Sequence, residues 1–221
     1  MADDLALGLR LADLYRFLLA ELPPPPARLL EIGCGDGELA RALAHAGYQV
    51  TAVDPRAPHG EIFRRGRFED FWDDRCFDAV LASVSLHHIE DFAAALDKVV
   101  ALLRPGGVLV LEEFAKERLS GPTAHWYYRQ RQALANVGDE PLPDDSERWQ
   151  EAWAEDHVDV HSYAEMRPEL DGRFAERLFT WTPYLYSYWL DDLLEPLERK
   201  LIAAGAIEAT GFRYVGEPKS T

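Results

Sequence analysis

The stretch "LLEIGCGDGELARAL", residues 29–43, decides the fold. Its apolar start predicts a buried strand over Arg28–Ile32, and the spacing of apolar residues after it predicts a helix over 37–46. The turn between them holds three glycines at alternate positions, Gly33, Gly35 and Gly37. A glycine turn between a strand and a helix is typical of sheets that bind a nucleotide or nucleoside at that edge.

The residues of the turn argue against a phosphate ligand. A dinucleotide turn follows the pattern G-x-G-x-x-G/A, and its third small residue would fall at Glu38. Asp36 and Glu38 also place carboxylates at a helix N-terminus, where they would repel a pyrophosphate. No Lys-Ser or Lys-Thr follows the glycines, so the Walker pattern fails as well. We therefore expect a nucleoside ligand without phosphate groups.

Strands and helices alternate along most of the chain. Near-continuous apolar strands separated by helices predict an α/β fold with a mostly parallel sheet covered on both faces. The expected strands are Tyr48–Val53, a brief one near Arg67–Glu69, 77–85, 108–114, 173–185 and 206–217. The expected helices are 3–21, a short one over 57–66, 91–103 and 186–205 with a kink at Pro196. Residues 115–172 break the pattern with aromatics, acids and prolines, and are expected to form a cap or lid within one domain over residues 1–221.

Five segments in chain order resemble the motifs of class I S-adenosylmethionine-dependent methyltransferases. "LLEIGCGDGELA" is similar to the first motif, "YQVTAVDP" to the second strand and "GRFEDF" to the segment that covers the adenine. "FDAVLASVSLHHIED" and "LRPGGVLVLEE" resemble the fourth and fifth strands of the small-molecule branch related to ubiquinone and menaquinone biosynthesis enzymes. The resemblance implies a Rossmann-like, doubly wound, seven-stranded sheet with a cap inserted between the fifth and sixth strands. It also implies S-adenosyl-L-methionine as cofactor.

The resemblance assigns roles to residues at the carboxyl ends of the strands. Glu31 would help to hold the methionine amino group. Asp54 would accept hydrogen bonds from the ribose hydroxyls, a role that its distance past the turn also fits. Phe68 would flank the adenine and Glu69 would accept a hydrogen bond from it. The other expected cofactor contacts are Gly33, Gly35, Gly37, Ser83 and His88.

Three residues are candidates for the catalytic step. Methyl transfer depends mainly on alignment, and needs a base only where the acceptor must lose a proton. His87 follows the fourth strand, and Glu112 closes the fifth, where at most one of Glu112 and Glu113 faces the pocket. His157 lies in "EDHVDVHSYAE" of the expected cap. The alternative for each is a role in packing or in a solvated surface.

Further residues within 115–190 are expected to bind the methyl acceptor. His157 and His161 would lie about 13 Å apart in an extended chain, and Ser162 with Glu165 predicts a helix start directly after them. We therefore predict no metal site, and expect His161 to line the acceptor pocket. Trp126, Tyr128 and Tyr184 are the aromatic residues most expected to wall it.

Composition limits the partners. Lys and Arg total 23 and Asp and Glu total 39, for a net charge of −16. Such a charge disfavours nucleic acid and anionic membrane surfaces and suits a small-molecule acceptor. Two cysteines and an acidic N-terminus without a leader pattern predict a cytoplasmic protein with reduced thiols, either monomer or homodimer.

Three other functions compete with a methyltransferase acting on a small, apolar or aromatic metabolite. A nucleic-acid amino-methyltransferase is disfavoured by the net charge and because residues 83–88 stand where an Asn/Asp-Pro-Pro-aromatic motif would be expected after the fourth strand. A nicotinamide-dependent oxidoreductase is disfavoured by Glu38 and by the lack of any Tyr-x-x-x-Lys pair. A non-catalytic S-adenosylmethionine-binding partner subunit is disfavoured because the turn and its acids are intact.

Overall fold

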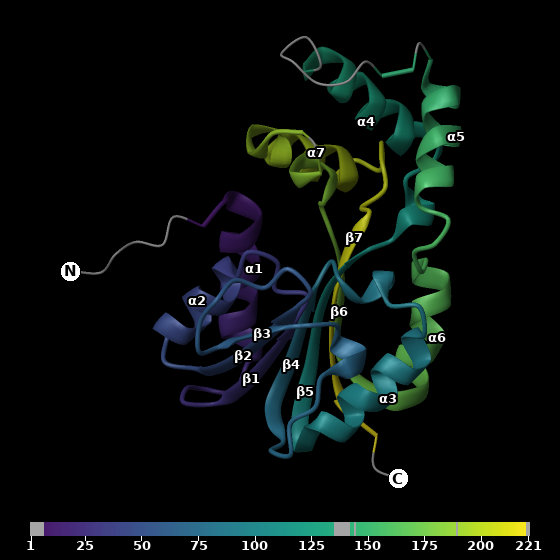
Figure 1. The fold of residues 1–221 in the computed structure, drawn as a ribbon. Helices are drawn as coiled ribbons and strands as arrows, with labels where there is room; N and C mark the ends of the chain where they lie inside the picture. The colour runs from purple at the N-terminus through teal and green to yellow at the C-terminus, as the bar shows by residue number, and fades with distance from the viewer. Residues whose placement is uncertain (1–6, 135–141, 144, 189, 220–221) are drawn as a thin grey trace, which may run out of the picture.

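A seven-stranded sheet forms the centre of the protein in the computed structural model, which describes residues 7–134, 142–143, 145–188 and 190–219 (Figure 1). Its strand order is β3-β2-β1-β4-β5-β7-β6. The strands are β1 (Arg28–Ile32), β2 (Gln49–Asp54), β3 (Phe63–Arg65), β4 (Phe77–Ser83), β5 (Leu103–Phe114), β6 (Phe174–Thr182) and β7 (Gly211–Pro218). The first five are parallel, and β7 is antiparallel to both β5 and β6. The predicted doubly wound, mostly parallel sheet is confirmed.

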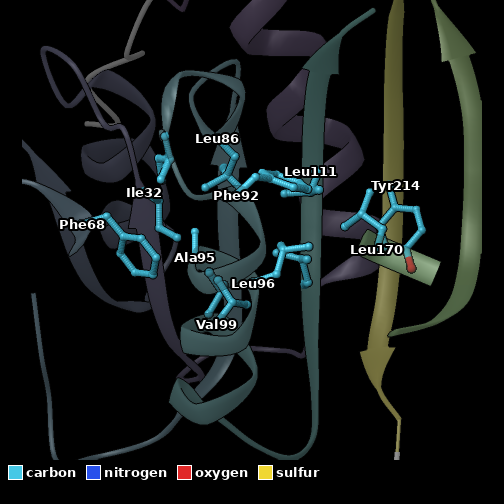
Figure 2. Packing of buried hydrophobic residues seen from close by; sticks show 14 of the residues in the cluster. Ile32, Phe68, Leu86, Phe92, Ala95, Leu96, Val99, Leu111, Leu170 and Tyr214 are labelled. Atoms are coloured by element: carbon cyan, nitrogen blue, oxygen red, sulfur yellow. The ribbon is translucent and has the colours of Figure 1, made fainter. Parts of the chain in front are cut away.

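Helices cover both faces of this sheet, which explains the continuous apolar strands. Successive residues of a strand point to opposite faces. Leu109 and Leu111 of β5 therefore pack on one side, and Val108 and Val110 on the other. The first side is covered by α3 (Phe92–Leu102) and α6 (Tyr163–Arg173), and Figure 2 shows its packing. The second is covered by α1 (Leu9–Glu21) and α2 (Glu38–His45).

The remaining helices lie at the end of the sheet where the parallel strands finish (Figure 1). These are α4 (Gly121–Leu134), α5 (Ser146–Asp156) and α7 (Glu195–Ala203). Helix α4 packs on α5, whereas α6 packs on α3 beside the sheet. Within residues 115–172, α4 and α5 thus lie beyond the end of the sheet, and α6 belongs to a covering layer.

Three local predictions are wrong. Residues 57–66 contain turns and the short strand β3 instead of a helix, and Phe68–Asp70 form a 3-10 helix instead of a strand. The helix expected over 186–205 begins only at Glu195, after 3-10 helices at Leu185–Ser187 and Asp192–Leu194. Pro196 stands in the first turn of α7, where its missing N–H costs nothing, so it starts the helix and does not kink it.

The predicted N-terminal helix and the predicted start of α6 agree with the structure. The N-terminal helix expected over 3–21 is α1, and residues 1–6 lie outside the described residues. Ser162 caps α6 as expected: its Oγ accepts the Glu165 N–H at 3.3 Å, and Glu165 Oε2 accepts the Ser162 N–H at 2.7 Å. This capping box fixes where the segment before α6 ends.

Candidate active site

The glycine turn between β1 and α2 adopts a backbone that only glycine takes easily. Gly33, Gly35 and Gly37 have φ of +76°, +50° and +75°. A Cβ on Gly33 would lie 2.2 Å from Ser85 Cβ, and one on Gly37 would lie 2.4 Å from the Phe63 ring. A Cβ on Gly35 would meet no protein atom within 4 Å. Gly33 and Gly37 thus let the chain pack on itself, and Gly35 faces open space.

A cavity of about 270 Å³ lies over this turn and is lined by a buried carboxylate. Glu31, at the end of β1, lines the cavity and is 3% exposed. Its Oε2 has no hydrogen-bond partner within the described residues. Burial, and then the negative charge of Asp54, raises the pKa of Glu31 to about 8. A buried carboxylate of this kind is stabilised when a cation or a hydrogen-bond donor binds next to it.

Arg10 of α1 brings a positive charge to the same cavity. Its Nη1 lies 2.5 Å from Glu112 Oε1 and 3.1 Å from Ser83 Oγ, which accepts a hydrogen bond from it. The other oxygen of Glu112 accepts hydrogen bonds from Arg213 Nε and Nη2 at 2.9 and 2.7 Å. Both oxygens of Glu112 are therefore engaged by arginines, an arrangement that favours a positioning role for Glu112 over the catalytic role expected from the sequence.

Asp54, at the end of β2, ties the glycine turn to its own strand. Its Oδ2 accepts the Gly35 N–H at 3.0 Å, and its Oδ1 accepts the Arg56 N–H at 2.6 Å. Each carboxylate oxygen keeps a further acceptor position. The side chain is 8% exposed and lines a second cavity, of about 330 Å³. Gly33 and Gly35 line both cavities, so the two spaces meet at the turn.

The second cavity collects the other expected nucleoside contacts. Phe68, Glu69 and His88 all line it. Lys98 of α3 holds the segment of Phe68 and Glu69 in place, because its Nζ donates to both of their carbonyl oxygens at 2.8 Å. Arg67 pairs with Glu69 at 2.5 Å, and this hydrogen bond helps to keep the pKa of Glu69 below its usual value against the opposing effect of burial. Burial and the neighbouring His87 lower the pKa of His88, which favours a neutral ring.

The loop after β4 is held by a buried carboxylate. Glu113 Oε1 accepts the N–H groups of Ser85 and Leu86 at 3.1 and 2.8 Å, and its Oε2 lies 2.5 Å from His87 Nδ1. His87 is 5% exposed. Its burial and its bond to Glu113 favour a role in fixing the loop over the catalytic role expected from the sequence. Val84, with φ of +50°, is a strained β-branched residue at the edge of the second cavity.

Five aromatic residues, which we call the aromatic wall, pack together beyond the end of β5. Phe114 stacks on Tyr184 and Tyr188, with ring centroids 5.0 and 6.2 Å apart. Val84 packs against the cluster that contains Phe114 and Tyr184, so the wall adjoins the second cavity. The wall consists of Phe114, Tyr127, Trp149, Tyr184 and Tyr188.

A second buried carboxylate shapes the chain that carries Tyr184 and Tyr188. Glu198 of α7 is fully buried and accepts the N–H groups of Tyr184, Leu185 and Tyr186 at 2.9, 3.1 and 2.7 Å. These charge-assisted bonds replace those of a longer helix and keep residues 184–186 in a tight turn. They oppose the effect of burial, which nevertheless raises the pKa of Glu198.

The residues expected to bind the acceptor fall into separate places. Tyr184 belongs to the aromatic wall, and Trp126 packs against the same cluster. Tyr128 is buried within the cap, where its hydroxyl donates to Pro143 O at 2.7 Å. His157 stacks on Trp153 at 4.0 Å and reaches the wall through Tyr188. His161 lies elsewhere, in a groove between α3 and α6, where its Nε2 lies 2.9 Å from Ile89 O.

The described residues hold neither a metal cluster nor a membrane-spanning helix. No group of three or more His, Cys, Asp or Glu side chains is arranged to hold a metal ion there. No helix in the described ranges combines the length and apolar character needed to cross a bilayer.

Comparison with known proteins identifies the family. A family model described as a methyltransferase domain matches residues 5–167. The chain belongs to the methyltransferase-domain family. This membership confirms the family that the sequence predicted. The match ends within α6, so the part of the aromatic wall at Tyr184 and Tyr188 lies outside it.

Relatives of this methyltransferase-domain protein carry related names. An uncharacterised methyltransferase of Mycobacterium tuberculosis is 38% identical over 112 residues, 44% of this chain and 55% of the relative. A ubiquinone biosynthesis O-methyltransferase of Methylocella silvestris is 35% identical over 123 residues, 49% of this chain and 48% of the relative. The chain spans about half the length of the curated relatives it matches. An S-adenosylmethionine dependent methyltransferase from Mesorhizobium loti has the same fold, with a TM-score of 0.59 at 16% identity over 96% of this chain and 99% of that one.

Four residues of the site were not found by sequence reasoning. Arg10 and Lys98 lie on helices and contact residues far away in the sequence. No local sequence pattern shows where these helices pack. Glu113 was considered only as the neighbour of Glu112, and Tyr188 was not singled out among the aromatic residues. The alternation of strand residues separated Glu112 from Glu113, but it does not reveal that their partners lie 26 to 102 residues away.

Proposed function

We propose that this protein is an S-adenosylmethionine-dependent methyltransferase that acts on a small, apolar or aromatic metabolite. The observation that carries the proposal is the unpaired, buried Glu31 Oε2 in a cavity that Arg10 also lines. A ligand that carries an amino acid group, with one ammonium and one carboxylate, complements the negative charge of Glu31 and the positive charge of Arg10. Asp36 and Glu38 line the same cavity, so its balance of charge disfavours a pyrophosphate.

The residues that line the two cavities fit S-adenosyl-L-methionine as cofactor. Glu31 would accept hydrogen bonds from its amino group, and Arg10 would donate to its carboxylate. Asp54 would use its free acceptor positions for the ribose hydroxyls, and Phe68 with Glu69 would hold the adenine. The open space above Gly35 lets the backbone approach the cofactor. When bound, the cofactor supplies an electrophilic methyl group on a sulfonium.

The chain's own residues would provide alignment and the exclusion of water. Glu113 and Val84 fix the loop after β4, which borders the second cavity. The aromatic wall continues from that cavity and offers flat apolar faces to the acceptor. Alignment of two reactants in a dry site supplies much of the rate of a displacement reaction. We expect a cytoplasmic protein, monomer or homodimer, without nucleic acid or membrane partners.

The acceptor class is tested by following a labelled methyl group. The protein is incubated with S-adenosylmethionine labelled in its methyl group and with a cell extract separated into small molecules, protein and RNA. We expect label to enter the small-molecule fraction and to require the purified protein. Label that enters only protein or RNA would contradict the proposed acceptor class, and no transfer to any fraction would favour a non-catalytic binding partner.

A further inference from the structure

A lysine from α3 fixes the main chain of the segment that carries Phe68 and Glu69. Lys98 Nζ donates to Phe68 O and Glu69 O, at 2.8 Å in each case, and lies 5.0 Å from the centre of the Phe68 ring. The Phe68 ring itself packs in the core on the α3 side of the sheet (Figure 2). One ammonium group that binds the carbonyl oxygens of two successive residues restrains the peptide between them. The direction in which the Glu69 side chain leaves the main chain is therefore set from α3.

The carboxylate of Glu69 is held at one oxygen and stays ionised. Arg67 donates from Nε and Nη2 to Glu69 Oε1 at 3.2 and 2.5 Å. Burial raises the pKa of Glu69, but the hydrogen bond from Arg67 and the charges of Arg67 and Lys98 outweigh it and keep this pKa below its usual value. A carboxylate oxygen can accept two hydrogen bonds, so Oε2 can accept from a ligand in the second cavity.

An ionised carboxylate distinguishes purines by the group at their 6-position. A 6-amino purine presents an N–H donor there, whereas a 6-oxo purine presents an acceptor. Because a carboxylate only accepts, Glu69 would bind the first and repel the second. The apolar face of Phe68 and the carboxylate of Asp54 would meet parts of a nucleoside that do not differ between the two purines. The preference for one purine over the other thus depends on how Glu69 is aimed.

We propose that Lys98 and Arg67 are positioning residues that aim Glu69 at the 6-position of the cofactor's purine, so that the site selects a 6-amino over a 6-oxo purine nucleoside. This inference rests on the proposed function, which puts the adenine beside Phe68 and Glu69. Lys98 lines neither cavity, so it acts on the purine only through the segment that it holds. Arg67 acts by holding Glu69 Oε1, which leaves Oε2 for the purine.

The test is calorimetric titration with S-adenosylhomocysteine and with S-inosylhomocysteine, whose purines differ in the 6-substituent. We expect the unmodified protein to bind S-adenosylhomocysteine about 10-fold to 100-fold more tightly. Lys98→Met keeps the length of the side chain but not its ammonium group, and should lower this ratio of affinities at least about 5-fold. Arg67→Gln, at an exposed position, should lower it as well without disturbing the core. Lys98→Arg can still donate to both carbonyl oxygens and should keep the ratio.

Lys116→Met is the matched control. Lys116, just after β5, donates from Nζ to His157 O and Val160 O at 2.8 and 2.5 Å, and it is half-buried, as is Lys98. It lines neither cavity. Its replacement removes the same kind of contact elsewhere, so the ratio of affinities should stay within about 2-fold of that of the unmodified protein. The ratio separates a positioning role of Lys98 from a general loss of stability, which would weaken the binding of both ligands alike.

Three results would overturn the inference. These are equal affinities of the unmodified protein for the two ligands, an unchanged ratio in either Lys98→Met or Arg67→Gln, and a ratio that falls as far in Lys116→Met or Lys98→Arg as in Lys98→Met. If S-adenosylhomocysteine binds the unmodified protein but no better than S-inosylhomocysteine, the selection fails and the proposed function stands. Absence of S-adenosylhomocysteine binding would remove both.

Discussion

Replacing Glu31 by Gln is expected to stabilise the free protein and to weaken its binding of S-adenosylmethionine. The pKa of Glu31 is about 8 in the folded protein, against 4.5 for the unperturbed group. The folded state therefore keeps a proton that the unfolded state releases between these values, so the stability contributed by this proton falls as the pH rises from 4.5 to 8. At about 1.4 kcal/mol per pH unit, ionisation linked to Glu31 costs about 3 kcal/mol by pH 7 and about 4 kcal/mol by pH 8.

Glutamine removes this cost because it cannot ionise. Denaturant unfolding at several pH values should show Glu31→Gln more stable than the unmodified protein by up to about 3 kcal/mol at pH 7, with the difference shrinking towards pH 4.5. The same variant should bind S-adenosylmethionine about 10-fold to 100-fold more weakly, because a charged partner of the amino group is lost. Glu38→Gln, at an exposed position on the same cavity, is the control and should change stability by less than about 0.5 kcal/mol. Equal stability of Glu31→Gln and the unmodified protein at pH 8 would contradict the assigned environment of Glu31.

Replacing Asp54 by Asn should cause the largest loss of cofactor affinity. The two carboxylate oxygens hold the N–H groups of Gly35 and Arg56, and an amide has only one oxygen to accept them. The variant therefore loses one bond that shapes the turn and a charged acceptor for the ribose. We expect S-adenosylhomocysteine to bind at least about 100-fold more weakly, which corresponds to about 3 kcal/mol.

The loss at Asp54 is measured by calorimetry beside a variant with the same change of charge. Asp74→Asn is suitable, because Asp74 is exposed, accepts a hydrogen bond from Trp72 and lines neither cavity. Its affinity for S-adenosylhomocysteine should equal that of the unmodified protein. A similar affinity in Asp54→Asn would mean that the second cavity does not hold the ribose.

The sequence was most informative where a local rule determines local structure. Apolar runs predicted the strands β1, β2, β4 and β5, and the Ser162 and Glu165 pair predicted the start of α6. The short strand β3 could not be found in this way, because Phe63–Arg65 carries two arginines and is a strand only through its pairing with β2. A proline such as Pro196 can either kink a helix or stand at its start. Here it stands at the start of α7, because the buried Glu198 holds residues 184–186 in a separate turn.

In the candidate site, the motifs predicted which residues reach the carboxyl edge of the sheet but not what each one contacts there. Glu31 and Glu112 are both buried acids at strand ends, yet Glu31 Oε2 has no hydrogen-bond partner among the described residues, whereas Glu112 is bound by Arg10 and Arg213. That difference depends on how α1 and β7 dock on β5. Tyr188 and His157 likewise form a hydrogen bond only because α5 places His157 beside a residue 31 positions further along the chain.

Calorimetric titration of the unmodified protein with S-adenosylmethionine and with NAD tests the central claim most directly. We expect S-adenosylmethionine to bind at pH 7 with release of a proton, seen as a dependence of the measured heat on the ionisation enthalpy of the buffer, because the ammonium group favours ionised Glu31. Glu31→Gln should lose that dependence, and NAD should not bind. Binding of NAD without binding of S-adenosylmethionine would contradict the account.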